Sequence, residues 1–532
     1  MRMSGLTVNH GVPKDVVRAM IGSAVRGYAY TLDVIRNGQP ARPRTYHVVT
    51  RMGPGHALGV FDNCVASVER ALLERYFFCL VGDRFHQPLR PQPAAFLSAG
   101  LAKFRACVVQ LVEPVCEAIT TSEVVALYTG PKRRLYQRAE ISLSRVPLNR
   151  SDATLRPFTK FEKQPLNKAC RIINPRSPRY NLALGRYLKH TEKAFYKAIN
   201  DVWGGRTAAT VIKGYNVRET AQILRHKWEL FQDPVAVGLD ATKFDMHVSI
   251  EALEYEHSFY NGAYRCPDLA EILSWQLYNR GVARCPDGEV RFTMPGTRSS
   301  GDLNTSLGNC ILMCAMIYEL CQVAGVDAEL CNNGDDCVLV LDRADLGKVV
   351  DEITPHFARL GFRMEVEQPV DVFEQIEFCQ SRPVWAGGWV MVRNVRTCLQ
   401  KDPMCLVPLQ SARVVRKWLG AVGEGGGALV SGVPVMQEFY AAFRRAGCRP
   451  GEGFKRHVFK NTSQLEREAS LACRVVDVSP AARASFYRAF GIAPDYQLGL
   501  EAFYRASCVT PQVVEGGRGI AEVSPEPCLG HL

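Results

Sequence analysis

Two acidic segments, Asp240-Ala-Thr-Lys-Phe-Asp245 and Asn333-Gly-Asp-Asp336, decide the fold that this sequence predicts. The first begins where the apolar run Pro234-Val-Ala-Val-Gly-Leu239 ends, and the β-branched residues of that run are typical of a buried strand. The second separates two short apolar runs, 328–332 and 337–341, and its composition favours a tight hairpin turn. We therefore expect three strands that carry carboxylates at their ends.

A third segment lies between these two in the sequence. Ser300-Gly-Asp-Leu-Asn-Thr305-Ser-Leu-Gly-Asn309 reads as a glycine-containing loop that enters an apolar helix over 303–323. A Gly-Asp-Asp turn by itself could be purely structural. However, adjacent acids repel each other, and a structural turn would favour Asn-Gly or Asp-Gly. A strand-terminal Asp240 about 95 residues upstream, with a polar loop in between, indicates a chemical site instead.

Phosphoryl transfer explains why three carboxylates would gather. Attack of a hydroxyl on a nucleotide phosphate is assisted by two Mg²⁺ ions about 3.5–4 Å apart. Magnesium prefers carboxylate oxygens together with water and phosphate, and strand ends hold such ligands rigidly. We expect Asp240 and Asp335 to bridge the ions, with Asp336 as an outer partner.

Charge is distributed unevenly along the chain. The whole protein has a net charge of +12, and residues 131–190 alone contain 15 Lys and Arg against 3 acids. Residues 327–378 contain 4 basic residues against 13 acids. A basic block and a separate acidic block predict a polyanionic partner and a distinct carboxylate centre, although a basic block can also be only a solvated surface.

Cysteine usage and hydropathy exclude two other classes. The chain has 19 cysteines but no Cys-x-x-Cys pair, which argues against a zinc ribbon. The most apolar stretch, 311–326, is interrupted by Glu319 and Gln322 and falls short of a membrane span. We expect buried, reduced thiols, which includes Cys310 and Cys314 on the apolar helix, and no transmembrane segment.

Other stretches give weaker expectations. Residues 1–60 read as an irregular arm, and the proline-punctuated block 131–190 reads as loop-like. Residues 344–360 read as a helix that Pro355 kinks or shortens. The run Gly423–Gly427 reads as a hinge.

The ordered set Asp-x4-Asp, Ser-Gly-x3-Thr-x3-Asn and Gly-Asp-Asp resembles motifs A, B and C of viral RNA-dependent RNA polymerases. Upstream, the segments Lys160–Lys163 and Asn167–Arg176 resemble the basic motif F, and Gly130–Arg138 resembles the segment that receives the template. Phe378–Pro383 resembles motif E. The residues within these motifs are most similar to those of polymerases from plus-strand plant viruses of the tombusvirus group, including the umbraviruses. The resemblance covers about residues 130–400.

The resemblance implies a role for individual residues. Those expected to act in catalysis and to bind metal are Asp240, Asp335 and Asp336. Those expected to bind the incoming nucleotide are Lys163, Lys168, Arg171, Asp245, Ser300, Gly301, Thr305 and Asn309, of which Asp245 and Asn309 would read the ribose 2′-hydroxyl. Those expected to bind the template are Lys132, Arg133, Arg134 and Arg176.

The resemblance also implies an α+β right-hand polymerase with an antiparallel-sheet palm, basic fingers and a mainly helical thumb. The expected divisions are 1–130 as N-terminal arm and fingers, 131–232 as basic fingers, 233–384 as palm with a fingers segment near 250–290, and 385–532 as thumb and tail. The implied cofactor is Mg²⁺ as two ions, which Mn²⁺ can replace.

The expected reaction is RNA-directed RNA synthesis that replicates a plus-strand genome, without a primer. The expected partners are single-stranded viral RNA, nascent RNA, nucleoside triphosphates and viral or host proteins of a replication complex. That complex would lie in the host cytoplasm, peripheral to membranes. Two alternatives remain at this point: a non-catalytic RNA-binding or capsid protein, for which the basic block would suffice, and a reverse transcriptase, against which Asp245, Asn309 and the Gly-Asp-Asp turn argue.

One departure from the family pattern concerns the general acid. Many of these polymerases have a motif D lysine, whereas residues 349–400 contain no lysine. Arginine is a poor acid because its pKa exceeds about 12, so the group that protonates pyrophosphate has no assignment from the sequence.

Overall fold

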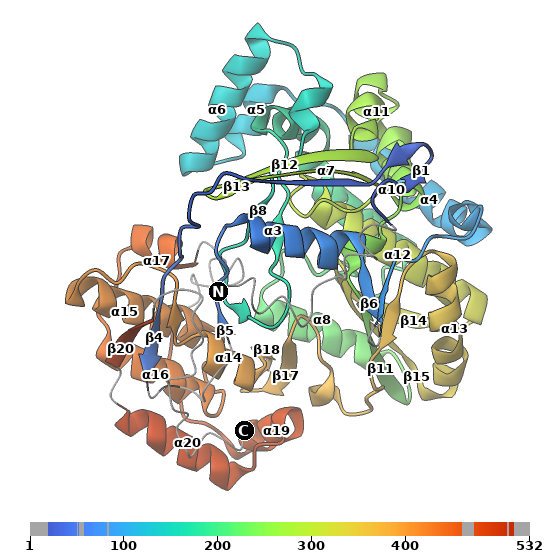
Figure 1. Ribbon diagram of the computed structural model, residues 1–532. Helices are drawn as coiled ribbons and strands as arrows, with labels where there is room; N and C mark the ends of the chain where they lie inside the picture. The colour runs from blue at the N-terminus through green and yellow to red at the C-terminus, as the bar shows by residue number, and fades with distance from the viewer. Residues whose placement is uncertain are drawn as a thin grey trace.

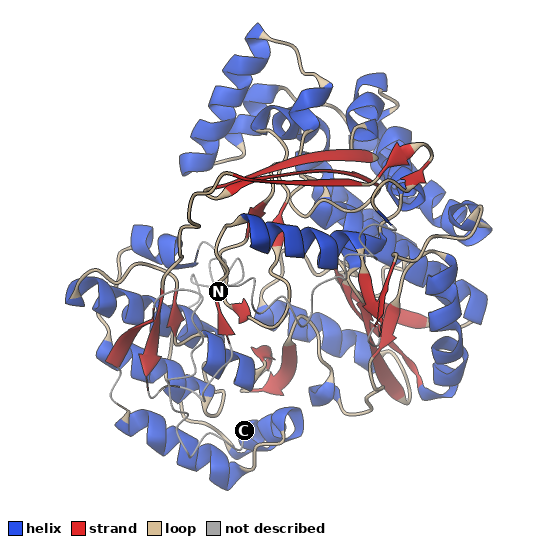
Figure 2. Cartoon of the chain, viewed as in Figure 1, coloured by secondary structure: helices blue, strands red, loops and turns tan. Residues whose placement is uncertain are grey.

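The computed structural model is a mixture of helices and strands, 50% helical and 18% strand, which is compatible with the expected α+β class. Helices surround several small sheets rather than forming a separate domain (Figure 2). The structure describes residues 20–50, 52, 58–81, 84–459, 473–507 and 510–514.

A four-stranded antiparallel sheet contains both acidic segments (Figure 1). Its strands, in spatial order, are β14 (Ala328–Asn333), β15 (Asp336–Asp342), β11 (Pro234–Ala241) and β16 (Met364–Val366). The expected strand and hairpin are therefore confirmed. The register places Asp240 directly opposite Asp336, so the two acidic segments meet at one end of the sheet.

Both faces of this sheet are buried, because side chains alternate between the two faces along each strand. Leu339 and Leu341 pack with α12 (Thr305–Ala324) and α13 (Leu346–Arg359), whereas Val338 and Val340 pack into a second core with α8 (Val217–Glu229). A side-chain period of two is what separates these residues between the two cores. The site is thereby built on a sheet held from both sides.

Helix α12 is the central helix of the larger core. Among the described residues it alone has the length and apolar composition of a membrane span, but 78% of its most apolar window is buried inside the protein. Cys310 and Cys314 lie in this core, as expected, and both are fully buried. Packing within the fold accounts for its apolar character.

The N-terminal region is more regular than expected. β3 (Thr31–Arg36) pairs with β13 (Gly288–Pro295), which pairs in turn with β12 (Tyr278–Cys285). β4 (Tyr46–Thr50) lies between two strands from the far end of the chain. The prediction of an irregular arm is wrong for these residues, because their pairing partners are remote in the sequence. Residues 1–19 lie outside the described residues.

The basic block is also more helical than expected. α6 (Gly130–Arg145) and α7 (Pro178–Val202) occupy both of its ends. Pro131 and Pro178 lie in the first turn of their helices, where the missing N–H has no intrahelical partner to lose. The prediction of a loop therefore holds only for the segment between the two helices.

Two further helices follow the first acidic segment, α10 (Ile250–Tyr264) and α11 (Pro267–Ser274). α13 runs through Pro355 without a break, so the expected shortening does not occur.

The C-terminal third is mainly helical. Its principal helices are α15 (Ala412–Leu429), α16 (Met436–Ala446), α17 (Glu452–Phe459), α19 (Pro480–Phe490) and α20 (Pro494–Ala506). The run Gly423–Gly427 is part of α15 and not a hinge. A Cβ on Gly426 would lie 2.1 Å from the Tyr440 ring, so glycine is required there because α16 packs closely against α15.

Candidate active site

A cavity of about 950 Å³ lies at the end of the central sheet where the acidic segments meet. Its walls come from the end of β11, the β14–β15 turn, the loop before α12, the start of α12, and the segment 160–173. Nine predicted site residues line it: Asp240, Asp335, Asp245, Ser300, Gly301, Thr305, Asn309, Lys168 and Arg171. The structure therefore brings together residues that are up to 167 positions apart in the sequence.

Asp240 and Asp335 line this cavity and are exposed, and Glu365 is a third exposed carboxylate in its wall. Gly334, with φ +90°, allows the tight turn that presents Asp335. Burial raises the pKa of Asp240, and the charges of Asp335 and Glu365 raise it further. Such mutual repulsion is what a bound cation would relieve.

Asp336 does not line the cavity, in contrast to Asp240 and Asp335. It is half-buried, and burial raises its pKa to about 6 although a hydrogen bond from the Cys379 amide lowers it. The placement agrees with a position outside the Asp240–Asp335 pair.

The residues present fit a magnesium site in part. Among the described residues, no three Asp, Glu, His or Cys side chains are grouped closely enough to hold a metal ion alone. Magnesium usually retains several waters and is held by one or two carboxylates plus substrate phosphates. The oxygen-only pair Asp240 and Asp335 matches that requirement.

A network of buried polar groups holds the side chains of Asn309 and Asp245, the two residues predicted from the sequence to read the ribose. Arg298 Nε donates to Asn309 Oδ1 at 2.9 Å, which leaves the Asn309 amino group to face Asp245. Burial, together with the charge of Asp335, raises the pKa of Asp245 to about 7. Arg298 is fully buried and forms an ion pair with Glu256, which is also fully buried.

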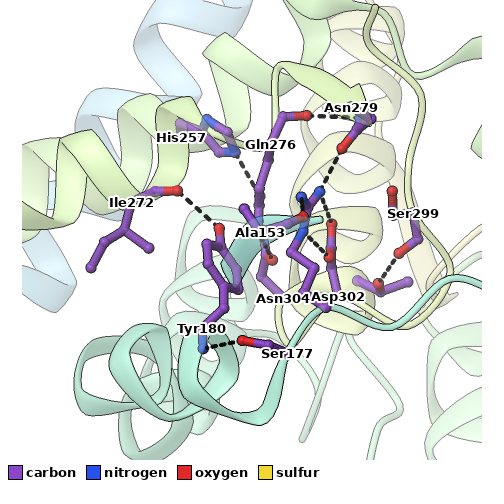
Figure 3. A network of polar contacts seen from close by, with 12 residues as sticks. Ala153, Ser177, Tyr180, His257, Ile272, Gln276, Asn279, Ser299, Asp302 and Asn304 are labelled. Atoms are coloured by element: carbon purple, nitrogen blue, oxygen red, sulfur yellow. Dashed lines mark hydrogen bonds and ion pairs between the residues drawn. The ribbon is translucent and has the colours of Figure 1, made fainter. Parts of the chain in front are cut away.

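Loop 299–304 is held in place by a further set of polar contacts (Figure 3). Thr305 Oγ1 donates to the Ser299 carbonyl at 3.1 Å, and Asn304 Nδ2 donates to Gln276 Oε1 at 3.2 Å. Gly301 has φ +130°, and a Cβ there would lie 3.1 Å from the backbone of Asn174. Glycine is therefore required where this loop passes the basic segment.

The cationic side of the cavity contains both expected and unexpected groups. Lys168 and Arg171 are exposed, and Arg171 Nε lies 2.9 Å from Glu162 Oε1. Arg75 and Lys213 also line the cavity, although neither belongs to a recognised motif. Lys213 Nζ lies 3.5 Å from the Asn333 carbonyl, so it reaches the acidic turn from a segment 120 residues upstream.

Two residues of the basic motif lie elsewhere. Lys163 donates to the Lys401 carbonyl beside Asp402, and burial lowers its pKa to about 8. It does not line the cavity, in contrast to the expectation that it binds nucleotide.

Arg176 has an internal position and not the template-facing one that was expected. Its guanidinium donates to Asp302 at 2.6 Å, to the Ala153 carbonyl at 2.6 Å and to Asn279 Oδ1 at 2.7 Å (Figure 3). Its side chain is 1% exposed, so no donor remains for RNA. The resemblance implied that Arg176 binds the template, and the tertiary contacts show that its side chain is buried inside the protein.

Lys132, Arg133 and Arg134 lie on the exposed surface of α6 and not in the cavity. Lys132 Nζ lies 4.9 Å from the centre of the Tyr128 ring. Figure 1 shows α6 on the outer part of the molecule, remote from the central sheet.

The central antiparallel sheet carries an Asp-x4-Asp segment at one strand end, beside a Gly-Asp-Asp turn. This arrangement is typical of proteins that polymerise nucleotides. Comparison with known proteins agrees. The family model described as viral RNA-dependent RNA polymerase matches residues 32–510. The chain belongs to this family. The expected family resemblance is confirmed, and a match of this extent supports neither a capsid protein nor a reverse transcriptase.

Similar curated proteins are RNA-directed RNA polymerases of plant viruses. The protein of tobacco necrosis virus strain A is 43% identical over 492 residues, which cover 91% of this chain and 66% of the relative. That of cucumber necrosis virus is 41% identical over 475 residues, or 88% of this chain and 57% of the relative. That of tomato bushy stunt virus is 38% identical over 510 residues, or 94% and 60%. The chain thus spans between half and two thirds of the length of these relatives.

Proposed function

We propose that this chain catalyses RNA-directed RNA synthesis for a plus-strand plant virus. The observation that carries the proposal is one cavity lined both by the carboxylates Asp240 and Asp335 and by the cations Lys168 and Arg171. Nucleotidyl transfer requires both groups, because the carboxylate pair binds the metal cations and the cationic wall neutralises the phosphates. The names printed for the relatives support the same reaction.

We assign the right-hand divisions on the same basis. The palm is the region 233–384 around the central sheet, the fingers are 131–232 together with the N-terminal arm and the segment near 250–290, and the thumb is 385–532. The mainly helical composition after residue 385 supports this assignment.

In this proposal, two Mg²⁺ ions, replaceable by Mn²⁺, would supply charge neutralisation and lower the pKa of the attacking hydroxyl. Asp240 and Asp335 would hold them, with Asp336 as an outer partner. Lys168 and Arg171 neutralise the triphosphate, because Arg171 can offer two parallel donors to phosphate. Lys213 and Arg75 add positive charge at the same wall.

The test is incorporation of labelled ribonucleotides on an RNA 3′ end without primer. We expect synthesis that requires RNA template and Mg²⁺ or Mn²⁺ and that stops with a chelator. Purified, folded protein that binds RNA but incorporates nothing with either cation would contradict the proposal.

Ribose selection gives a second test. Removing the Asp245 or Asn309 side chain should lower the preference for GTP over dGTP by about 5- to 150-fold, because a buried polar site loses its hydroxyl partner with deoxyribose. The measurement is the ratio of kcat/KM for the two nucleotides on one template, for Asp245→Ala and Asn309→Ala. Thr242→Val changes another cavity residue and serves as the control, with the wild-type ratio expected. An unaltered ratio in both test variants would contradict the ribose-reading role.

Salt dependence tests the basic block. If six of its exposed Lys and Arg contact phosphates, log K for single-stranded RNA should fall with log[salt] at a slope of about −4. Replacing Lys132, Arg133 and Arg134 with Gln should make the slope shallower by about 2, since three contacts are lost. Arg265→Gln, which removes an exposed charge outside the block, should not change it. A wild-type slope near zero would mean that the block is only a solvated surface.

A further inference from the structure

A second cavity, of about 390 Å³, lies outside the candidate active site. Its walls come from β2 (Tyr28–Ala29), from the single turn 150–153, from the end of α11, and from β12. None of the segments that resemble polymerase motifs contributes to its lining.

Three aromatic rings line this cavity, those of Tyr28, Trp275 and Tyr278. The rings of Tyr28 and Tyr278 have centroids 5.0 Å apart and planes inclined at 41°. All three residues are half-buried, so part of each side chain remains accessible. Such rings are suited to stacking with flat ligands.

The charged groups at this cavity are cationic. Arg150 and Arg280 both line it, and both are exposed. Neither forms an ion pair within the described part of the chain, and no Asp or Glu is among the described lining residues. The adjacent Asp152 is already paired with Arg179 at 3.0 Å. The cavity therefore attracts anions and offers them two free guanidinium groups.

Aromatic faces beside unpaired arginines are the features with which proteins bind single-stranded nucleic acid without reading its sequence. We propose that this cavity binds one nucleotide of an unpaired RNA strand, with its base stacked on Tyr278 or Trp275 and its phosphates contacted by Arg150 and Arg280. The strand would be part of the template, and that last identification rests on the proposed polymerase function.

The position of Arg176 supports the link to the template. Its guanidinium donates both to the carbonyl of Ala153, in the wall of this cavity, and to Asp302, in the wall of the catalytic cavity (Figure 3). The third partner, Asn279, lies in β12 between Tyr278 and Arg280. One buried residue thus links the walls of both cavities through direct hydrogen bonds.

The test measures RNA affinity separately from catalysis. The probe is a fluorescein-labelled, unstructured 20-nucleotide RNA at fixed salt, and the variants are Tyr278→Leu and the double variant Arg150→Gln/Arg280→Gln. We expect each to raise Kd by about 5- to 100-fold, the range for loss of one stacked base or its charge contacts. The control Arg284→Gln removes an 82% exposed arginine from the same strand outside the cavity and should leave Kd unchanged.

Crosslinking identifies the occupant. RNA containing 4-thiouridine should crosslink to Tyr278 or Trp275, and excess GTP should not displace it. Unchanged Kd in both variants, with far-UV circular dichroism showing that they fold, would overturn the proposal. Loss of the crosslink in millimolar GTP would overturn it in favour of a free-nucleotide site.

The proposed function is tested independently. Asp335→Ala should bind the same RNA with wild-type Kd and retain its dependence on Arg150 and Arg280. Failure of the polymerase proposal would therefore appear as absent synthesis with this RNA site intact. Failure of the present inference would appear as normal RNA synthesis together with an RNA Kd that the substitutions in the second cavity do not change.

Discussion

Asp335→Ala should reduce RNA synthesis by about a thousandfold or more while the protein remains folded. Loss of one metal-binding carboxylate removes several kcal/mol of transition-state stabilisation, and each 1.36 kcal/mol corresponds to a tenfold change in rate. The fold should be unaffected or slightly stabilised. Asp335 is exposed, and its charge raises the pKa of both Asp240 and Asp245, so its removal relieves repulsion.

The measurement is single-nucleotide incorporation on an RNA template, together with a thermal unfolding midpoint. Asp240→Ala should give the same loss. Asp342→Ala is the matched control, because Asp342 lies at the opposite end of β15 from Asp336 and outside the cavity. Retention of more than about a tenth of wild-type activity in folded Asp335→Ala would refute the catalytic assignment.

Arg298→Met should give the largest loss of stability. The side chains of Arg298 and Glu256 are both 0% exposed. Removing one partner leaves an uncompensated buried carboxylate, which costs about 3–5 kcal/mol of unfolding free energy. The same substitution removes the hydrogen bond to Asn309 Oδ1, so the Asn309 amide, which we propose reads the ribose, also loses its fixed orientation.

The measurement is the free energy of unfolding from a urea titration in which two spectroscopic probes monitor the unfolding transition. Arg291→Met is the control, since its ion pair with Glu289 is on the surface, and it should change stability far less than Arg298→Met does. Arg298→Met/Glu256→Gln should recover part of the loss because the buried charge is removed as well. A loss in Arg298→Met no larger than in Arg291→Met would show that the pair does not stabilise the fold.

The central sheet could be predicted because its signals are local. The β-branched run before Asp240, the turn at Gly334 and the apolar helix after Ser300 each specify an element within a few residues of the chain. The motif order then brought Asp240, Asp335 and Asn309 into one expected site, and all three line the cavity.

The direction in which each basic side chain points could not be predicted in the same way. Lys168, Lys163 and Arg176 lie within 14 residues and look equivalent in a basic motif. In the structure the first lines the cavity, the second contacts the Lys401 carbonyl and the third is an internal brace. The difference depends on partners that are distant in the sequence, such as Asp302 for Arg176.

The sequence by itself determined the carboxylate pair, the basic block, and the strands and helix that carry the segments resembling polymerase motifs. Only the tertiary structure decided which cations face the carboxylates, that Lys213 joins them, and that β3 pairs with β13 rather than forming an irregular arm. The reason is physical: turns and the alternation of buried and exposed side chains depend on residues that are neighbours in the sequence. Strand pairing and the burial of a charge depend instead on groups that meet only when the chain has folded.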